Sequence, residues 1–499
     1  MKKIKELLTK YYPLLLIGVV TFISLTFASQ CSFLYSMNRW NDVNCFFSVA
    51  MALNNGKVLY QDIYEQKGPY LYFLHQFIIL ISNGTYIGAY LIELVLGFVF
   101  AYFTYKSLSL YVSNKKYVTL ATSLVIVFYY ISFSFCQGDS VEELFIPFFL
   151  MSLYFALKAL KTNTDIAYYH YALDGLIFGL ALLMKFTLIA FYIPYMITLF
   201  IYLIKDKKVA RAFINIALFI LGFVVSIIPS LVYFGINDAY SSFFTVYFYN
   251  NLFLYGGENK ENFFLKIWDF IVAYFSSLGI GYSYYLLIIT SAVYLLMHRS
   301  LLKNRQVKLI IAIYVVLNFV IFIGGKNYAY YGLPNVIFAF LGTVAIYYFL
   351  RNNKKFLELY AKRSKLLTYS FVSFVLVLSV FGSQNTYRAF TKNEDLVQYK
   401  FKAEIDKVEN ATILNYGFLD LGCFYICNSA PTVKYFCGLN IAYPELIESQ
   451  DNYVKEGATT FVISRNVEPT GIYDKYHLVM AVDAQIDYEM FTFYLFKLN

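Results

Sequence analysis

Residues 36–75 read SMNRWNDVNCFFSVAMALNNGKVLYQDIYEQKGPYLYFLH and follow the first long apolar run of the chain. The stretch holds an acid, Asp42, then an apolar helical run that ends in Asn-Asn-Gly, and then Gln-Lys-Gly-Pro around Lys67. An acid and a lysine that bracket a short amphipathic helix at a bilayer surface can hold a lipid-linked substrate. We therefore expect the functional residues of the chain to centre on this stretch.

The composition is that of a membrane protein. The chain has 499 residues, of which 60% are hydrophobic and 14% charged, and its mean hydropathy is +0.57. Soluble proteins carry about 25% charged residues. Several apolar runs reach the ~20 residues that cross a bilayer as a helix. The net charge of +9 does not indicate nucleic-acid binding, because the basic residues cluster in short loops between the apolar runs.

The apolar runs predict an all-α polytopic membrane protein with about eleven transmembrane helices. The predicted spans are about 12–33, 85–110, 117–135, 143–160, 171–186, 188–204, 212–234, 275–297, 308–324, 331–350 and 366–382. Residues 70–82 are apolar but too short to cross, which predicts a re-entrant or interfacial helix. Lys and Arg are concentrated in alternate loops, and this bias predicts a cytoplasmic N-terminus in a multi-pass plasma-membrane protein.

Residues 1–383 are therefore predicted to form the membrane domain, with outer loops at 34–84, 136–142, 235–274 and 325–330. The composition changes after it, and 384–499 is predicted to form a small soluble α/β domain on the extracytoplasmic side. Its expected helices are 391–410 and 444–457, and its expected strands are 411–417, 432–437, 459–465, 476–482 and 490–498.

The six cysteines show no metal-binding spacing. A disulfide among Cys423, Cys427 and Cys437 is one expectation if the C-terminal domain is extracytoplasmic, and buried free thiols are the equal alternative.

The predicted outer loops contain the candidate site residues. Asp42 and Lys67 are the strongest, because they bracket an apolar helix and the Gly-Pro that starts the next membrane segment. Glu142 and Glu143 have a simpler alternative as partners of a helix dipole, and Lys185 as a side chain that snorkels to lipid headgroups. The other candidates for substrate binding are Arg39, Tyr60, Asp139, Lys326 and Tyr330.

This set of residues suits transfer from a phosphate-linked lipid donor. A lysine at headgroup depth can stabilise a lipid phosphate as leaving group, and a carboxylate that faces it can take the proton of an acceptor hydroxyl. The sequence has no Gly-rich phosphate loop, no HExxH, no GxSxG and no Cys/His cluster, so nucleotide-binding, hydrolase and metalloprotease interpretations have no motif to support them.

At these residues the chain resembles a known family. An acid after the first span, then G-x-x-x-Y-x-D at 56–62 and K-G-P at 67–69, is similar to GT-C glycosyltransferases of the protein-mannosyltransferase and aminoarabinose-transferase type. The resemblance continues at LDGLIFGLALLMKFT (173–187) and at GGKNYAYYGLP (324–334). It covers the whole architecture, including an outer soluble domain after the last span.

The resemblance implies roles for individual residues. Asp42 would be the general base, Lys67 would bind the donor phosphate, and Lys185 and Lys326 would be weaker phosphate-side candidates. Asp139 or Glu142 would help to form the sugar or acceptor pocket.

Two positions depart from the family pattern and leave the substrate open. Val43 follows Asp42 where the mannosyltransferase branch has a second acid, and Tyr330 replaces the loop histidine. No cofactor is certain. Some family members use a divalent metal, and the sequence leaves such an ion open here, although we expect Asp42 and Asp139 not to share one.

The expected function is transfer of a sugar from a polyprenyl-phosphate donor to a cell-envelope glycan, lipid or polymer. The expected partners are these substrates and membrane lipids, and no nucleic acid. Two alternatives remain. A polysaccharide polymerase or ligase usually centres on arginines in a late outer loop, and 235–265 has none. A flippase or transporter tends to show inverted repeats and charges within spans, and we expect neither in this chain.

Overall fold

The computed structural model describes residues 2–254, 263–298, 301–440, 443–486 and 489–499. The chain forms two compact units. The first, here the helical unit, comprises Met1–Ser32, Tyr90–Ile227 and Asn262–Thr386. The second, here the mixed unit, comprises Phe33–Ala89, Ile228–Glu261 and Tyr387–Asn499. The C-terminal segment thus forms one compact unit with the first predicted outer loop, a grouping that the sequence did not predict.

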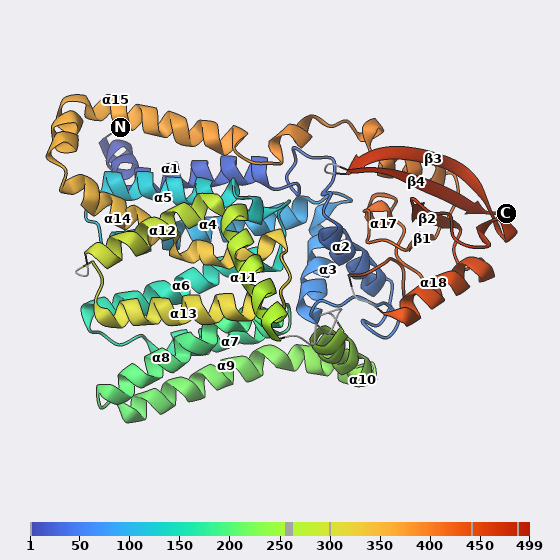
Figure 1. Ribbon diagram of the computed structural model, residues 1–499, viewed down its shortest axis with the longest axis horizontal. Coiled ribbons are helices and arrows are strands. Elements are labelled where there is room, and N and C mark those ends of the chain that lie inside the picture. Colours follow the sequence, from blue (N-terminus) through green and yellow to red (C-terminus); the bar gives the residue numbers. More distant parts are fainter. Residues whose placement is uncertain (1, 255–262, 299–300, 441–442, 487–488) are drawn as a thin grey trace. The chain divides into compact units, whose positions relative to one another are not determined.

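The helical unit is a bundle of long helices that run side by side (Figure 1). The elements are α1 Lys2–Ala28, α4 Ile87–Ser109, α5 Lys115–Tyr130, α6 Val141–Thr162, α7 Tyr168–Leu182, α8 Tyr192–Lys205, α9 Val209–Ile236, α11 Phe263–Ile280, α12 Tyr282–Met297, α13 Asn304–Phe322, α14 Ala339–Arg351 and α15 Lys354–Phe381, with 3₁₀ segments η1 Phe133–Phe135, η2 Phe186–Phe191 and η4 Ala329–Phe338. The last turns of α9 belong to the mixed unit.

Among the described residues, eight helices are long and apolar enough to cross a membrane, or nine if one bent pair counts as a span. The polytopic helical fold is therefore confirmed, while the number eleven stays a prediction. Two predicted spans became α5 and α7, which have 16 and 15 residues and are shorter than the 18 residues of the shortest candidate span.

One predicted span is wrong, because the structure has two helices there and not one. Residues 275–297 were expected as a single helix after a loop, but the structure has α11 and α12, bent by 104° around Gly281. A Cβ at Gly281 would collide with the Tyr284 side chain, so a larger residue at the bend would force that side chain to move. Residues 263–274, expected in the outer loop, belong to α11.

The basic loops of the helical unit gather at one end of the bundle. Lys303, after α12, donates from Nζ to the Lys161 carbonyl at the end of α6, at 2.6 Å. Arg305 donates two hydrogen bonds of 2.6 Å to Asp206 in the α8–α9 turn. Loops that alternate along the sequence therefore meet at one end, as the charge pattern predicts for a membrane bundle.

The opposite end of the bundle holds the intervening loops. The Gln30 amide donates to the Gln137 carbonyl at 2.9 Å. Asn385, just after α15, donates from Nδ2 to the Ala28 carbonyl at 2.6 Å and to the Cys136 carbonyl at 2.7 Å. Segments from the start, middle and end of the unit are thus tied together here.

The mixed unit combines short helices with one sheet. Its elements are α2 Asn41–Asn54, α3 Pro69–Ser82, α10 Tyr240–Phe243, the π-helix η3 Phe244–Leu254, α16 Val397–Ile405, α17 Cys423–Ile426, α18 Pro444–Glu456, and strands β1 Ile413–Tyr416, β2 Phe461–Arg465, β3 Tyr476–Ile486 and β4 Glu489–Leu498. The strand order is β1-β2-β4-β3, with β1 and β2 parallel and the other pairs antiparallel.

The alternation of side chains between the two faces of each strand explains the core of the sheet. Leu414, Val462 and Phe496 are paired across β1, β2 and β4, so they share one face, and all three are buried. Val454 of the amphipathic helix α18 joins the same core cluster. Burial of these apolar side chains, at about 25 cal/mol per Å², holds the helix on the sheet.

Most of the predicted C-terminal elements are present. Four of the expected strands and the helix at 444–457 occur near the predicted positions. The expected strand at 432–437 is irregular instead, and its Phe436 carbonyl accepts one hydrogen bond of 2.9 Å from the Asn415 amide. The expected helix at 391–410 is limited to α16 and the short 3₁₀ turn Asn393–Asp395.

Candidate functional site

The α2–α3 hairpin of the mixed unit positions the two main candidates. Asp42 lies in the first turn of α2, where the helix dipole favours a carboxylate. Lys67 directly precedes Gly68 and Pro69, the residues that start α3. The Lys67 Nζ lies 3.4 Å from Asp42 Oδ2, and the two side chains are 14% and 15% exposed. The structure therefore brings together the acid and the lysine that the sequence singled out.

The backbone of Lys67 is fixed from both sides. Its amide donates to Glu65 Oε2 at 2.8 Å and to the Tyr72 hydroxyl at 3.2 Å. Its carbonyl accepts a hydrogen bond of 2.5 Å from the Tyr60 hydroxyl. The Lys67 ammonium also lies 5.9 Å from the centre of the Phe46 ring, within reach of a cation–π interaction.

Tyr60, a predicted substrate-binding residue, is fully buried. It has a φ of 67°, which an L-residue adopts only where packing enforces it, and its ring stacks 5.7 Å from Phe234 and 6.2 Å from Phe243. Its hydroxyl donates to the Lys67 carbonyl, and its role in substrate binding stays a prediction.

Glu65 is a functional candidate that the sequence prediction did not select. Its side chain is 3% exposed, and burial raises its pKa above the ordinary value, while the Lys67 charge and amide lower it in part. The nearby Asp42 charge raises the pKa of Glu65 further. An acid two residues before the lysine of the K-G-P motif was the available signal.

A second pair of candidates lies within the helical unit. Lys185 forms an ion pair with Glu142, which is 3% exposed. The Lys185 ammonium lies 4.6 Å from the ring centre of Tyr330 and 4.5 Å from that of Tyr331. The aromatic ring that replaces the family's histidine thus contacts this lysine directly, and Glu142 has a charge partner as well as a place in the first turn of α6.

Asp139 and Glu143 lie in a buried acidic group of the same unit. The Asp139 amide donates to Glu143 Oε2 at 3.0 Å and to Glu93 Oε1 at 2.7 Å, and the Ser29 hydroxyl donates to Glu93 Oε2 at 2.6 Å. The Glu143 amide also donates to the hydroxyl of Ser140, the residue that caps the start of α6, at 3.1 Å. These bonds fix the loop that enters α6.

Glu93 corrects the expectation that the spans carry no charged residues. It is 1% exposed within α4, and Asp174 within α7 is 2% exposed and accepts hydrogen bonds from the hydroxyls of Ser152, at 2.6 Å, and Tyr195, at 3.1 Å. In the sequence, the signal for these buried charges was the single acid inside each of the two apolar runs, Glu93 in α4 and Asp174 in α7. Within the part of the chain that the structure describes, no group of three or more His, Cys, Asp and Glu side chains is placed to hold a metal ion.

The remaining candidates lie at loop positions. Arg39 is half-buried just before α2, and Lys326 is half-buried between α13 and η4. Cys423, Cys427 and Cys437 are free thiols, so the disulfide that was one expectation for the C-terminal segment is not formed. Cys437 instead lies with its Sγ 3.9 Å from the Sγ of Cys45 on α2.

Comparison with known proteins shows which family model and which solved structure this chain resembles. Residues 66–233 match the family model described as dolichyl-phosphate-mannose-protein mannosyltransferase. The chain is similar in structure to ArnT from Cupriavidus metallidurans, solved bound to undecaprenyl phosphate, with a TM-score of 0.63 and 10% identity over 98% of each chain. This chain has the GT-C fold. No curated protein matches it in sequence.

The GT-C resemblance predicted from the sequence is thus confirmed. The matched segment begins after Asp42, and the candidate residues that it contains are Lys67, Asp139, Glu142, Glu143 and Lys185. The GT-C fold extends over the C-terminal segment as well, since the structural match covers nearly the whole chain.

Proposed function

We propose that this GT-C protein is a membrane glycosyltransferase that takes a sugar from a polyprenyl-phosphate donor and passes it to a cell-envelope glycan, lipid or polymer. The observation that carries the proposal is the 3.4 Å pair of Lys67 and Asp42, held at the start of two short helices and still partly open to solvent. The name of the matched family, which contains dolichyl-phosphate-mannose, and the undecaprenyl phosphate in the similar ArnT structure support a lipid-phosphate donor.

In the proposed reaction Lys67 moves from Asp42 to the donor phosphate. Its neutralisation of the phosphate oxygens stabilises the leaving group, and the same movement frees the Asp42 carboxylate. Asp42 then takes the proton of the acceptor hydroxyl while the acceptor oxygen attacks the anomeric carbon. The bond from the anomeric carbon to the phosphate oxygen breaks, polyprenyl phosphate leaves, and the single displacement inverts the anomeric configuration.

Glu65 and Tyr60 position Lys67 in this scheme. Glu65 binds the Lys67 amide and Tyr60 binds its carbonyl, so the backbone stays in place when the ammonium moves. Lys185, Lys326, Arg39, Asp139, Glu142, Glu143 and Tyr330 remain proposed substrate-binding residues. Any metal that took part would need ligands beyond the two carboxylates of Asp42 and Glu65 that lie near Lys67 in the described part of the chain.

We further propose that the basic end of the helical unit faces the cytoplasm. The Lys and Arg residues of alternate loops meet at that end, and such loops stay on the cytoplasmic side of a plasma membrane. The C-terminal segment, 384–499, would then be extracytoplasmic, as the sequence predicts.

Mass spectrometry of lipid-linked and envelope glycans tests the function. Cells with wild-type protein, no protein, Asp42→Asn or Lys67→Ala are compared, with Lys57→Ala as a matched loss of charge in the same loop. We expect one envelope sugar to disappear and its lipid-phosphate donor to accumulate in all but the wild type and Lys57→Ala. Intact transfer in both site variants at normal expression refutes the mechanism. Accumulation of a complete lipid-linked unit on the inner face supports a flippase instead.

A further inference from the structure

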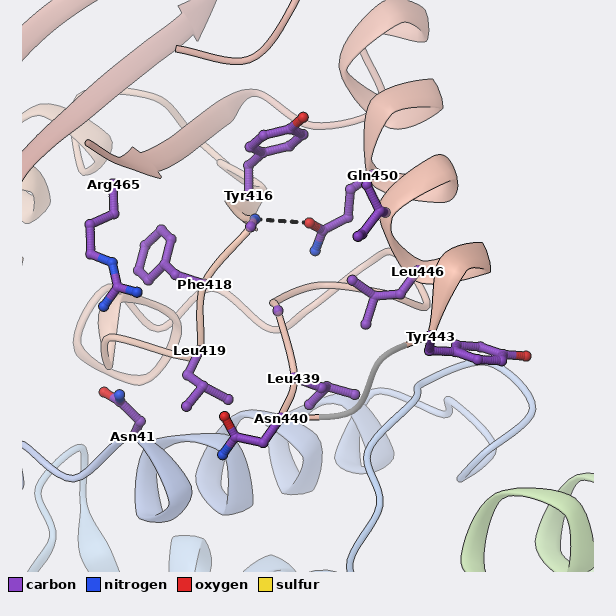
Figure 2. A pocket seen from close by; sticks show the side chains of 13 residues that line it. Asn41, Tyr416, Phe418, Leu419, Leu439, Asn440, Tyr443, Leu446, Gln450 and Arg465 are labelled. Atoms are coloured by element: carbon purple, nitrogen blue, oxygen red, sulfur yellow. Dashed lines mark hydrogen bonds between the residues drawn. The ribbon is translucent and has the colours of Figure 1, made fainter. Parts of the chain in front are cut away.

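A cavity of about 350 Å³ lies within the mixed unit, at the carboxyl ends of the parallel strands β1 and β2 (Figure 2). Small-molecule sites have volumes of about 300–1,000 Å³, and in open α/β sheets they lie outside the carboxyl ends of the strands. Its lining comes from Asn41, 416–419, 438–440, Tyr443, Leu446, Ile447, Gln450 and Arg465. Neither the family match nor the predicted site includes the C-terminal part of this cavity.

The walls of the cavity are fixed before any ligand binds. Gln450 of α18 accepts from the Gly417 amide at 2.9 Å and donates to the Tyr435 carbonyl at 2.9 Å, so it joins two loops to the helix. The Gly438 amide donates to the Phe418 carbonyl at 2.7 Å, and a Cβ at Gly438 would lie 2.7 Å from the Phe418 nitrogen. Such close packing of two loops gives the preorganised walls that lower the entropy cost of binding.

The charge of the lining is positive and unbalanced. Arg465 is the ionised residue of the lining, and no carboxylate lines the cavity among the described residues. Its guanidinium lies 5.5 Å from the ring centre of Phe418 and 4.8 Å from that of Phe491. The guanidinium takes part in no ion pair or hydrogen bond within the described ranges, so its N–H groups remain available to an anion. A guanidinium held by aromatic rings keeps its planar fork in place for a carboxylate or a phosphate.

Two amides provide neutral polar contacts in the same cavity. The Asn41 and Asn440 side chains have no hydrogen-bond partner within the described part of the chain, and Figure 2 shows them on the same side of the cavity as the Arg465 guanidinium. Leu419 lies between Asn41 and Asn440 in this view, and Leu439 lies beside Asn440. Amides that bind hydroxyls, next to apolar side chains that contact C–H groups, suit a sugar ring.

We propose that this cavity, the Arg465 cavity, binds an anionic sugar residue of the acceptor. The inference rests on the proposed glycosyltransferase function and names the acceptor class. The Arg465 guanidinium pairs with the carboxylate or phosphate, and the amides of Asn41 and Asn440 bind ring hydroxyls.

The cavity is connected to the reaction centre through α2. Asn41 lines the cavity, and the next residue, Asp42, is the proposed base. Successive side chains on a helix point about 100° apart, so the two residues serve neighbouring faces of the same first turn. A sugar held at Asn41 is thereby brought close to the carboxylate that would deprotonate it.

Saturation-transfer NMR on the full-length protein in lipid nanodiscs tests the proposal. The probes are glucuronate, glucose 6-phosphate and glucose. We expect at least one acidic sugar to bind at least tenfold more tightly than glucose, and binding to weaken as salt is added. The better of the two acidic probes shows whether the anion is a carboxylate or a phosphate. Failure of the wild type to bind either acidic probe more tightly than glucose overturns the proposal.

Three variants identify the residue responsible. Arg465→Gln is expected to weaken the acidic sugar at least tenfold and leave glucose unchanged, and Arg465→Lys to retain part of the preference. Lys475→Gln removes an exposed positive charge elsewhere in the same segment and should change nothing. Unchanged binding by Arg465→Gln, or an equal loss in Lys475→Gln, refutes the assignment. The preference retained by the folded Arg465→Lys variant excludes simple unfolding as the cause.

The binding assay is independent of sugar transfer. Asp42→Asn should bind the acidic sugar as the wild type does, because Asp42 does not line the cavity. If transfer proves absent from the protein while this binding persists, the proposed function fails and the cavity assignment stands as a sugar site. If transfer occurs and Arg465→Gln leaves the acceptor KM unchanged, the cavity assignment fails alone.

Discussion

The buried carboxyl of Asp420 leads to a prediction about pH. Asp420 is fully buried, and its Oδ2 accepts a hydrogen bond of 2.5 Å from the Ser48 hydroxyl, while its Oδ1 accepts one of 2.7 Å from the Gly422 amide. Burial raises the pKa of Asp420 from 3.8 to about 6, although these two hydrogen bonds lower it in part. Since Ser48 lies on α2, the helix that begins beside Asp42, this carboxyl ties the C-terminal segment to the proposed reaction centre.

The sign follows from the raised pKa in the folded state. Below pH 3.8 the Asp420 carboxyl is neutral in both the folded and the unfolded chain, so its ionisation does not lower the free energy of unfolding. Between pH 3.8 and about 6 the carboxyl ionises in the unfolded chain but stays neutral in the folded one. The free energy of unfolding therefore falls as the pH rises through this range. A shift of about two pKa units corresponds to roughly 3 kcal/mol of unfolding free energy. Asp420→Asn stays neutral, can still hydrogen-bond Ser48, and should therefore be more stable than the wild type at neutral pH.

Hydrogen exchange of the full-length protein, measured by mass spectrometry, reports this difference locally. At pH 7 the peptide that covers β1 and Asp420 should exchange up to roughly 100-fold more slowly in Asp420→Asn than in the wild type, and at pH 4 the two should be nearly equal. Glu448→Gln removes an exposed acid of α18 and should show no such effect. An Asp420→Asn difference that is the same at both pH values, or faster exchange at pH 7, refutes the reasoning.

Three further predictions concern the lysine loop, helix packing and the thiol pair. Tyr60→Phe removes the hydrogen bond to the Lys67 carbonyl, about 1 kcal/mol, and should lower kcat/KM of sugar transfer roughly fivefold. Gly175→Ala places a Cβ against the backbone of α9 and should lower the thermal unfolding midpoint, since such overpacking costs about 1–3 kcal/mol. Treatment with diamide should join Cys45 to Cys437, whose Sγ atoms lie 3.9 Å apart, as peptide mapping can show.

Each of these predictions has a matched control. Tyr60→Phe should cost nothing further when Lys67 is already alanine, and an equal loss in both backgrounds argues against positioning of the lysine. Gly279→Ala, where a Cβ meets no atom within 4 Å, should leave the midpoint unchanged, and an equal fall in both variants refutes the packing argument. Cys45→Ser should abolish the cross-link, and its persistence would show that Cys437 reacts with another thiol.

Local sequence patterns predicted much of the fold. Apolar runs of membrane length placed most of the long helices, and period-2 alternation placed β1, β2, β3 and β4, because both signals arise within a few residues. Asp42 and Lys67, which the structure places 3.4 Å apart, were also singled out by the sequence, since they flank an apolar helix and a Gly-Pro helix start. The bend at Gly281 was missed because the apolar run continues through it.

Tertiary packing alone decided which distant segments meet. Cys45 and Cys437 lie 392 residues apart in the chain, and Ser48 and Asp420 lie 372 apart, yet both pairs are in contact. Residue type and spacing carry no signal for such pairs, since they form only when the apolar faces of α2 and the C-terminal segment are buried together. The sequence by itself determined a membrane bundle with an acid and a lysine in its first loop. The Arg465 cavity beside α2 depended on the tertiary structure, because its lining comes from segments that are far apart in the chain.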